Sequence, residues 1–154
     1  MRAVRTCGRY VQDGADEHCN AVRMSFESRH VSTFIAADPD DVYAYAADPA
    51  KLPEWAAGLA DGIREDAGRW IADAPFGVVE VRFVPRNEHR VLDHDVVMPD
   101  GAIVHNPVRV VPAEGGAELI FTIHRREDMT AEQFASDVAA VEADLATLRG
   151  ILER

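Results

Sequence analysis

The stretch that decides the fold is residues 130–152, TAEQFASDVAAVEADLATLRGIL. Its first four residues form a capping box, in which the Thr hydroxyl and the Gln side chain bond N–H groups that the first helical turn leaves free. Apolar residues then recur at alternating steps of four and three, which predicts one amphipathic helix of about six turns. The apolar stripe consists of Phe134, Val138, Val141, Leu145, Leu148 and Leu152. Four charged residues lie off it: Glu142, Asp144, Arg149 and Glu153.

A helix of this length needs a large apolar surface to lie on, and the segment before it predicts an antiparallel sheet. Val31, Thr33 and Ile35 alternate with neighbours that face the other way, as in a half-buried strand. Turn signals such as Pro99-Asp100-Gly101 then recur about every ten residues, which favours a meander of antiparallel strands. The further strands are expected at 59–65, 69–73, 77–85, 90–98, 102–111 and 117–125, which makes seven with the first.

Two short helices are predicted between the first strand and the second. Asp38-Pro39 and Asp48-Pro49 are both helix starts, because Asp caps the helix and Pro fits its first position. Apolar residues follow each start at helical spacing, and the second helix is expected to end at Gly58. The fold class is therefore α+β: a seven-stranded curved sheet around a long C-terminal helix, with two short helices after the first strand.

The chain of 154 residues has the size of one domain. We expect this domain at residues 26–154 and a poorly ordered extension at residues 1–25. In the extension the apolar residues follow neither the period of a helix nor that of a strand. The sequence leaves open whether residues 1–23 belong to the functional protein. Cys7, His18 and Cys19 lie in this extension, and three potential ligands without a fourth do not predict a metal site. No metal and no cofactor are expected.

The formal net charge of −11 disfavours binding to nucleic acids and to anionic membranes. No stretch approaches the ~18 consecutive apolar residues of a membrane-spanning helix. The N-terminus has arginines but lacks the apolar region of a secretory signal, so we expect a cytoplasmic protein. A homodimer is left open.

The order of elements and several short sequence segments resemble those of the START-like superfamily, also called SRPBCC. Residues 40–45, DDVYAY, followed by Asp48-Pro49 and by LPEW at 52–55, resemble the opening of these domains. Residues 141–145, VEADL, with Leu148, resemble the terminal helix of bacterial members labelled polyketide cyclases. The resemblance covers about 130 residues and implies a helix-grip fold. The superfamily includes polyketide cyclase/dehydrase-like proteins, lipid-transfer START domains and plant pathogenesis-related allergens, and it has no shared catalytic motif.

Alternation along the strands assigns an inward, apolar face to each of them. The inward residues are Val79, Val81 and Phe83; Leu92, Val96 and Met98; Val104, Val108 and Val110; and Leu119, Phe121 and Ile123. Two polar residues share this face, His94 and Asn106, and the turn at 99–101 makes them near neighbours on successive strands. Asp93 and Asp95 face outward by the same rule, so no inward carboxylate is identified.

Three interpretations of His94 and Asn106 are open. A buried polar group costs ~1–3 kcal/mol unless it is hydrogen-bonded, so the two side chains could bond each other or a buried water. They could instead orient a ligand in an apolar pocket. Finally, His94 is a candidate catalytic acid–base, although no inward carboxylate is present to orient it. His89, His105 and His124 show no metal-ligand spacing, and two of them face outward.

We expect a cavity between the sheet and the C-terminal helix that binds a small hydrophobic molecule. The expected ligand-binding residues are Trp55, Val79, Val81, Phe83, His94, Asn106 and Phe121. The resemblance implies two alternatives: a polyketide cyclase/dehydrase-like enzyme, and a protein-interaction module like the Hsp90 ATPase activators. Whether the protein is an enzyme is left open. A void above ~300 Å³ beside His94 would favour a ligand site.

Overall fold

The computed structural model describes residues 27–59, 62–75 and 77–154. Cys7, His18 and Cys19, and with them the expected N-terminal extension, lie outside these residues. The strands are β1 (Ser28–Ile35), β2 (Ile63–Asp66), β3 (Arg69–Ala74), β4 (Gly77–Phe83), β5 (His94–Val97), β6 (Ile103–Asn106), β7 (Val108–Ala113) and β8 (Gly116–His124). The helices are α1 (Pro39–Ala46), α2 (Leu52–Trp55) and α3 (Ala131–Leu152), with short 3₁₀ turns η1 (Pro49–Lys51) and η2 (Ala57–Leu59).

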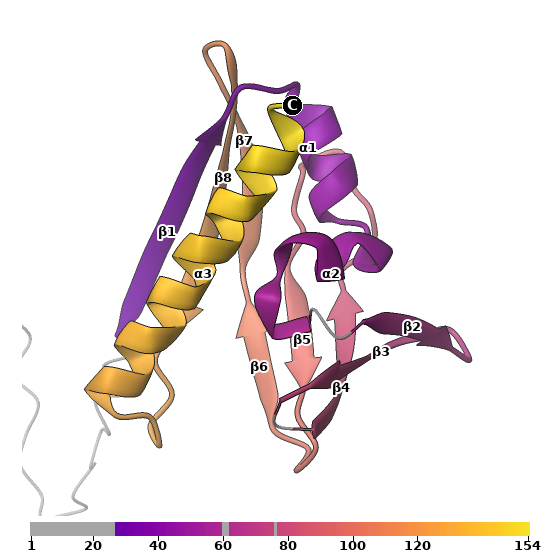
Figure 1. Cartoon of the computed structure of the whole chain (residues 1–154), viewed down its shortest axis with the longest axis vertical. Helices are drawn as coiled ribbons and strands as arrows, with labels where there is room; N and C mark the ends of the chain where they lie inside the picture. Colours follow the sequence, from indigo (N-terminus) through magenta and orange to yellow (C-terminus); the bar gives the residue numbers. More distant parts are fainter. Residues whose placement is uncertain (1–26, 60–61, 76) are drawn as a thin grey trace, which may run out of the picture.

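The strands form two antiparallel sheets, in the order β1-β8-β7 and β2-β3-β4-β5-β6. Residues 90–92 join them, because Leu92 N–H donates to the Val108 carbonyl (3.0 Å) and Val110 N–H donates to the Arg90 carbonyl (3.1 Å). In Figure 1 the helix α3 crosses the sheet diagonally, with β1 and β8 on one side and β5 and β6 on the other. The predicted α+β arrangement with a long C-terminal helix is confirmed.

The predicted count of seven strands is wrong, because the described residues hold eight. The expected strand 102–111 divides at Pro107 into β6 and β7, since proline has no N–H to give to a strand ladder. The Asp93 carboxylate accepts the next N–H, that of Val108, at 2.8 Å and bonds the Arg109 guanidinium. The expected strand 90–98 shortens to β5, and the strand expected from residue 59 begins at Ile63.

Helix α3 begins as its sequence predicts. The Thr130 hydroxyl accepts from the Gln133 N–H, and the Gln133 side chain accepts from the Thr130 N–H. Phe134, Leu145 and Leu148 of the stripe are buried, and the other stripe residues are half-buried. The helix therefore packs tightly at Phe134 and at Leu145 and Leu148, and less tightly between them, where Val138 and Val141 lie. Of the helices in the described part of the chain, none is both long and apolar enough to cross a bilayer.

The two short helices after β1 cover one end of the sheet (Figure 1). The carboxylates of Asp38 and Asp48 accept N–H groups at 2.8 and 3.0 Å, and they cap the starts of α1 and of the 3₁₀ turn η1 that leads into α2. The Tyr45 hydroxyl donates to Glu54 at 2.6 Å and thereby ties α1 to α2. Burial and this carboxylate raise the pKa of Tyr45 to about 12, so the hydroxyl stays protonated as a donor. The linkage supports the position of α2, whose Leu52 and Trp55 side chains are part of the hydrophobic core.

Candidate functional site

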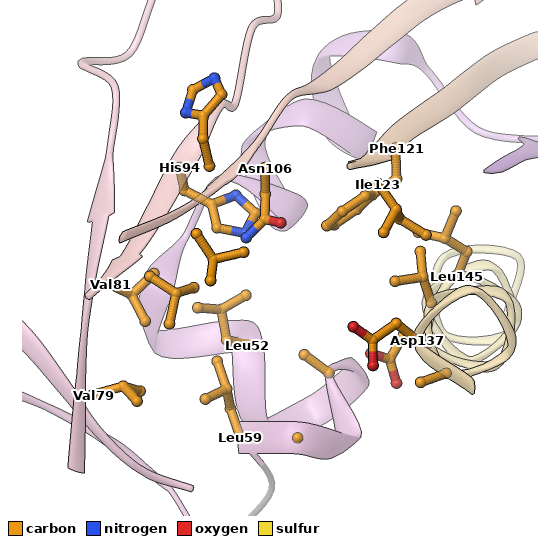
Figure 2. Close-up of a pocket in the computed structure, with 18 of the residues that line it drawn as sticks. Leu52, Leu59, Val79, Val81, His94, Asn106, Phe121, Ile123, Asp137 and Leu145 are labelled. Carbon is orange, nitrogen blue, oxygen red and sulfur yellow. The ribbon is translucent and has the colours of Figure 1, made fainter. Parts of the chain in front are cut away.

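A cavity of about 280 Å³ lies between α3 and the sheet. This volume is just below the lower end of the ~300–1,000 Å³ range of small-molecule pockets. Figure 2 shows the arrangement: Val79 and Val81 come from β4, His94 and Asn106 from the next two strands, and Leu145 from α3 on the opposite side. The apolar wall is made by Leu52, Trp55, Ala56, Leu59, Val79, Val81, Val96, Val104, Phe121, Ile123, Ala140, Val141 and Leu145.

The cavity opens to solvent between η2 and the first half of α3. Gly58 on one side and Asp137 and Ala140 on the other line the cavity and are themselves exposed. The Ala57 N–H donates to the Asp144 carboxylate at 2.9 Å, which fastens η2 to the helix. A small molecule therefore has an entrance whose two sides are linked through one side chain.

His94 lies on the sheet wall between two aromatic rings. Its ring centroid is 4.8 Å from that of Phe83 and 5.9 Å from that of Phe121, with the Phe121 ring edge-on. The Nδ1 atom lies 3.2 Å from the Leu92 carbonyl oxygen. Because a carbonyl only accepts, Nδ1 carries the proton and Nε2 has a free lone pair. Burial lowers the pKa of His94, so the ring is neutral at neutral pH.

Asn106 is the residue directly opposite His94 in the β5–β6 register, as the turn spacing predicts. In the described part of the chain, however, the two side chains do not bond each other, and the His94 ring bonds a backbone carbonyl instead. Both side chains line the cavity. Figure 2 shows the two side chains near each other on the wall of the cavity. The polar groups of this wall are thus directed to the cavity.

Six of the seven residues expected to bind a ligand line the cavity: Trp55, Val79, Val81, His94, Asn106 and Phe121. The seventh, Phe83, is opposite His94 in the β4–β5 register and contacts its ring from outside the lining. Trp55 is 6% exposed, and its indole N–H has no hydrogen-bond partner among the described residues.

Strand parity, which applies only to strands, did not predict two carboxylates of the lining. Asp137 and Asp144 of α3 line the cavity from the helix side. Burial raises the pKa of Asp144, and the N–H of Ala57 opposes this effect. The helical spacing contains the signal, since residues 137, 141 and 144 lie one helical turn apart on one face. That face borders the apolar stripe at Val141.

The remaining polar residues of the lining bond other protein groups. His105 and His124 are exposed at the rim, as the strand parity predicts, and bond Asp95 (2.7 Å) and Ser28 (2.9 Å). Arg126 lies 3.5 Å from the Asp128 carboxylate. Across residues 27–59, 62–75 and 77–154, no three side chains of the metal-ligating types gather at one place. The cavity walls therefore offer apolar contacts and hydrogen bonds.

Residues 28–153 match a family model described as polyketide cyclase / dehydrase and lipid transport. No curated protein matches the chain.

Several solved structures share the fold at low sequence identity. A START superfamily protein from Mycobacterium smegmatis is 14% identical with a TM-score of 0.63, over 82% of this chain and 97% of that one. The Aha1 dimer from Colwellia psychrerythraea is 15% identical with a TM-score of 0.65, over 82% and 96%. The XoxI protein from Bacillus cereus is 14% identical with a TM-score of 0.64, over 81% and 94%. At these identities the likeness is one of fold alone.

Proposed function

Because the chain belongs to the polyketide cyclase/dehydrase and lipid transport family, we propose that it binds a small, largely hydrophobic molecule in the cavity between the sheet and α3. The family match confirms the resemblance seen in the sequence, and the family's description includes both catalysis and transport. The similarity to Aha1 is limited to the fold, so it does not support a protein partner for this chain.

The observation that supports binding is an apolar void that the C-terminal helix leaves open. Leu145 and Leu148 are 1% and 0% exposed, so the helix is firmly seated, yet about 280 Å³ next to it is unfilled. An unfilled apolar cavity in a core costs stability, because its lining loses packing contacts. A cavity that also opens to solvent and contains a few directed polar groups is typical of ligand sites.

Filling the cavity tests this proposal. Val81 is 2% exposed and lines the cavity, whereas Val78 on the same strand is 53% exposed on the other face. We expect Val81→Phe to abolish binding of 2-methoxynaphthalene, an uncharged apolar probe, and Val78→Phe to leave it unchanged. Titration followed by NMR should shift resonances of Leu52, Val81 and Leu145 in the wild type. Equal binding by both variants, or shifts confined to the outer sheet face, would refute the proposal.

Catalysis is a second candidate, and the hydrogen bond of His94 favours it. A neutral imidazole whose Nδ1–H is fixed by the Leu92 carbonyl presents Nε2 as a base to the cavity. On a substrate with acidic C–H groups between carbonyls, such as a polyketone, this nitrogen would accept the proton. His94→Gln should then lower turnover by ~10²–10⁴-fold with ligand affinity retained. A carrier would lose affinity at most, and no turnover would be present to lose.

A further inference from the structure

The polar groups that face the cavity determine which hydrophobic molecules it accepts, if the proposed function holds. One of these groups is the His94 ring. Its Nδ1 lies 3.2 Å from the Leu92 carbonyl oxygen, which fixes the proton on Nδ1. The remaining ring nitrogen, Nε2, therefore accepts hydrogen bonds and cannot donate one while the ring is neutral. Burial lowers the pKa of this ring, which keeps it neutral near pH 7. The sheet wall thus offers a ligand an acceptor.

The helix wall also offers acceptors. Asp144 uses one carboxylate oxygen for the Ala57 N–H at 2.9 Å, which leaves the other oxygen free to accept. Asp137 lies two turns earlier on the same face, and in Figure 2 it borders the cavity opposite the strands. In the described part of the chain its carboxylate has no ion-pair partner. Two carboxylates of one helix therefore line a largely apolar cavity, Asp144 half-buried and Asp137 at the exposed entrance.

Positive charge in the lining does not balance these carboxylates. Arg126 is exposed at the rim and lies near Asp128, a residue outside the cavity. The rings of His105 and His124 are hydrogen-bonded to Asp95 and Ser28. The Asn106 amide can both donate and accept hydrogen bonds, so it favours neither donor groups nor acceptor groups on the ligand. A ligand that enters thus meets three acceptors, His94 Nε2 and the carboxylates of Asp137 and Asp144, and the two carboxylates carry negative charge when ionised.

We propose that the ligand of this cavity is a compact apolar molecule bearing hydroxyl or amine groups, and that the cavity rejects carboxylates such as fatty acids. A hydroxyl or ammonium group donates to Asp144, Asp137 or His94 Nε2 and replaces the hydrogen bonds that it loses on leaving water. A carboxylate has no donor to offer, and it would lie beside like charges in a space lined by hydrocarbon, which is strongly unfavourable.

Four probes with one two-ring body test this selectivity: 2-naphthol, 2-naphthylmethylamine, 2-methoxynaphthalene and 2-naphthoate. Affinities are measured at pH 7.5 by calorimetry or NMR titration of the full chain. The first two should bind about tenfold more tightly than the methyl ether, because each donates to an acceptor on the wall. The carboxylate should bind at least about tenfold more weakly than the ether.

Single variants of α3 assign the effect to its residues. Asp144→Asn keeps an oxygen for the Ala57 N–H and removes the charge, so it should strengthen 2-naphthoate binding about tenfold and weaken amine binding. Asp137→Asn should act in the same direction. Glu142→Gln makes the same change of charge on an exposed position of the helix outside the cavity lining, and it should leave all four affinities unchanged.

The outcomes separate this inference from the proposed function. If 2-naphthoate binds as tightly as 2-naphthol, the donor selectivity is overturned while binding in the cavity stands. If Glu142→Gln alters the affinities as much as Asp144→Asn does, the overall charge selects the ligand and the inference is overturned. If none of the probes binds, the methyl ether included, both the inference and the proposed function are overturned.

Discussion

His94 and Asn106 are paired directly across the β5–β6 ladder, and both side chains face the cavity without bonding each other. The His94 ring bonds the Leu92 carbonyl, and the Asn106 side-chain amide bonds no other group within the described part of the chain. Residues that stabilise a core by hydrogen bonding are usually satisfied within the protein. This pair therefore offers its polar atoms to the cavity, in agreement with a role in ligand binding.

Asn106→Leu should change the free energy of unfolding by less than about 1 kcal/mol, because no bond to another protein group is lost. Asn87 is a matched control. Its side chain bonds the Pro85 and Val91 carbonyls and the His89 N–H, at 2.9 to 3.1 Å. Asn87→Leu should cost at least about 2 kcal/mol, since several backbone groups lose their partner. Urea denaturation measures both. An equal cost at the two positions would show that the Asn106 amide has a structural partner.

Much of the fold could be predicted from periodicity. The stripe from Phe134 to Leu152 and the alternation along β4 and β8 report burial directly, since each follows the repeat of one element. The division at Pro107 was missed because turn signals at both ends of 102–111 suggested one strand. Its cause is local, because Pro107 has no N–H for a strand ladder and the next N–H, that of Val108, donates to the Asp93 carboxylate just before β5.

The cavity was harder to predict than the fold. Strand parity assigned Val79, Val81, His94, Asn106 and Phe121 to the inner face, and all five line the cavity. Parity could not show that Phe83 contacts the His94 ring from outside the lining. It also could not identify Asp137 and Asp144, because the side of a helix that borders a void depends on how the helix is rotated against the sheet. That rotation is a tertiary property, so the helical spacing places residues 137, 141 and 144 on one face but does not show that this face borders the void.

The environment of His94 predicts a pH-dependent stability. Burial lowers its pKa below the ordinary value of 6.5, so the folded state holds the neutral ring. Well above pH 6.5 the ring is neutral in both the folded and the unfolded state, so the protonation of His94 does not reduce the stability. As the pH falls from 6.5 toward the lowered pKa of the folded state, the unfolded chain binds the proton first. Stability is then lost by up to about 1.4 kcal/mol per pH unit.

Urea denaturation of the wild type and His94→Leu between pH 7.5 and 5 measures this effect. The wild type should lose more stability than the variant over this range, because only the wild type has the buried ring. His89→Leu is the control, since the His89 side chain is 75% exposed, and it should follow the wild type. Parallel curves for the wild type and His94→Leu would mean that the ring accepts a proton in the folded state as readily as in the unfolded one.

The attachment of α3 can be tested at Leu148, which is 0% exposed. Leu148→Ala should lower the free energy of unfolding by about 2–5 kcal/mol, since a large buried side chain is removed from the core. Leu152, on the same stripe but half-buried, should cost clearly less when changed to alanine. A loss below about 1 kcal/mol at Leu148 would indicate that the helix does not rest on the sheet, and the cavity would then lack one wall.

Asp144→Asn should make the unliganded protein more stable at pH 7. Burial raises the pKa of Asp144 above its ordinary value of 3.8, so the folded state disfavours the charged carboxylate. The favourable contribution of this group is complete below pH 3.8 and is lost as the pH rises through the raised pKa. At neutral pH the charge therefore reduces stability, and asparagine removes it while an oxygen remains for the Ala57 N–H.

Thermal unfolding of the wild type, Asp144→Asn and the surface control Glu142→Gln at pH 7 and at pH 3.5 measures this difference. The melting temperature of Asp144→Asn should exceed that of the wild type at pH 7, and the gap should shrink at pH 3.5, where the carboxyl is mostly neutral in both states. A gap of the same size for Glu142→Gln would assign the effect to the net charge of −11. If the gap is specific to Asp144, this carboxylate lowers stability at the cavity wall. Residues of that kind are typical of functional sites, where activity and stability favour different side chains.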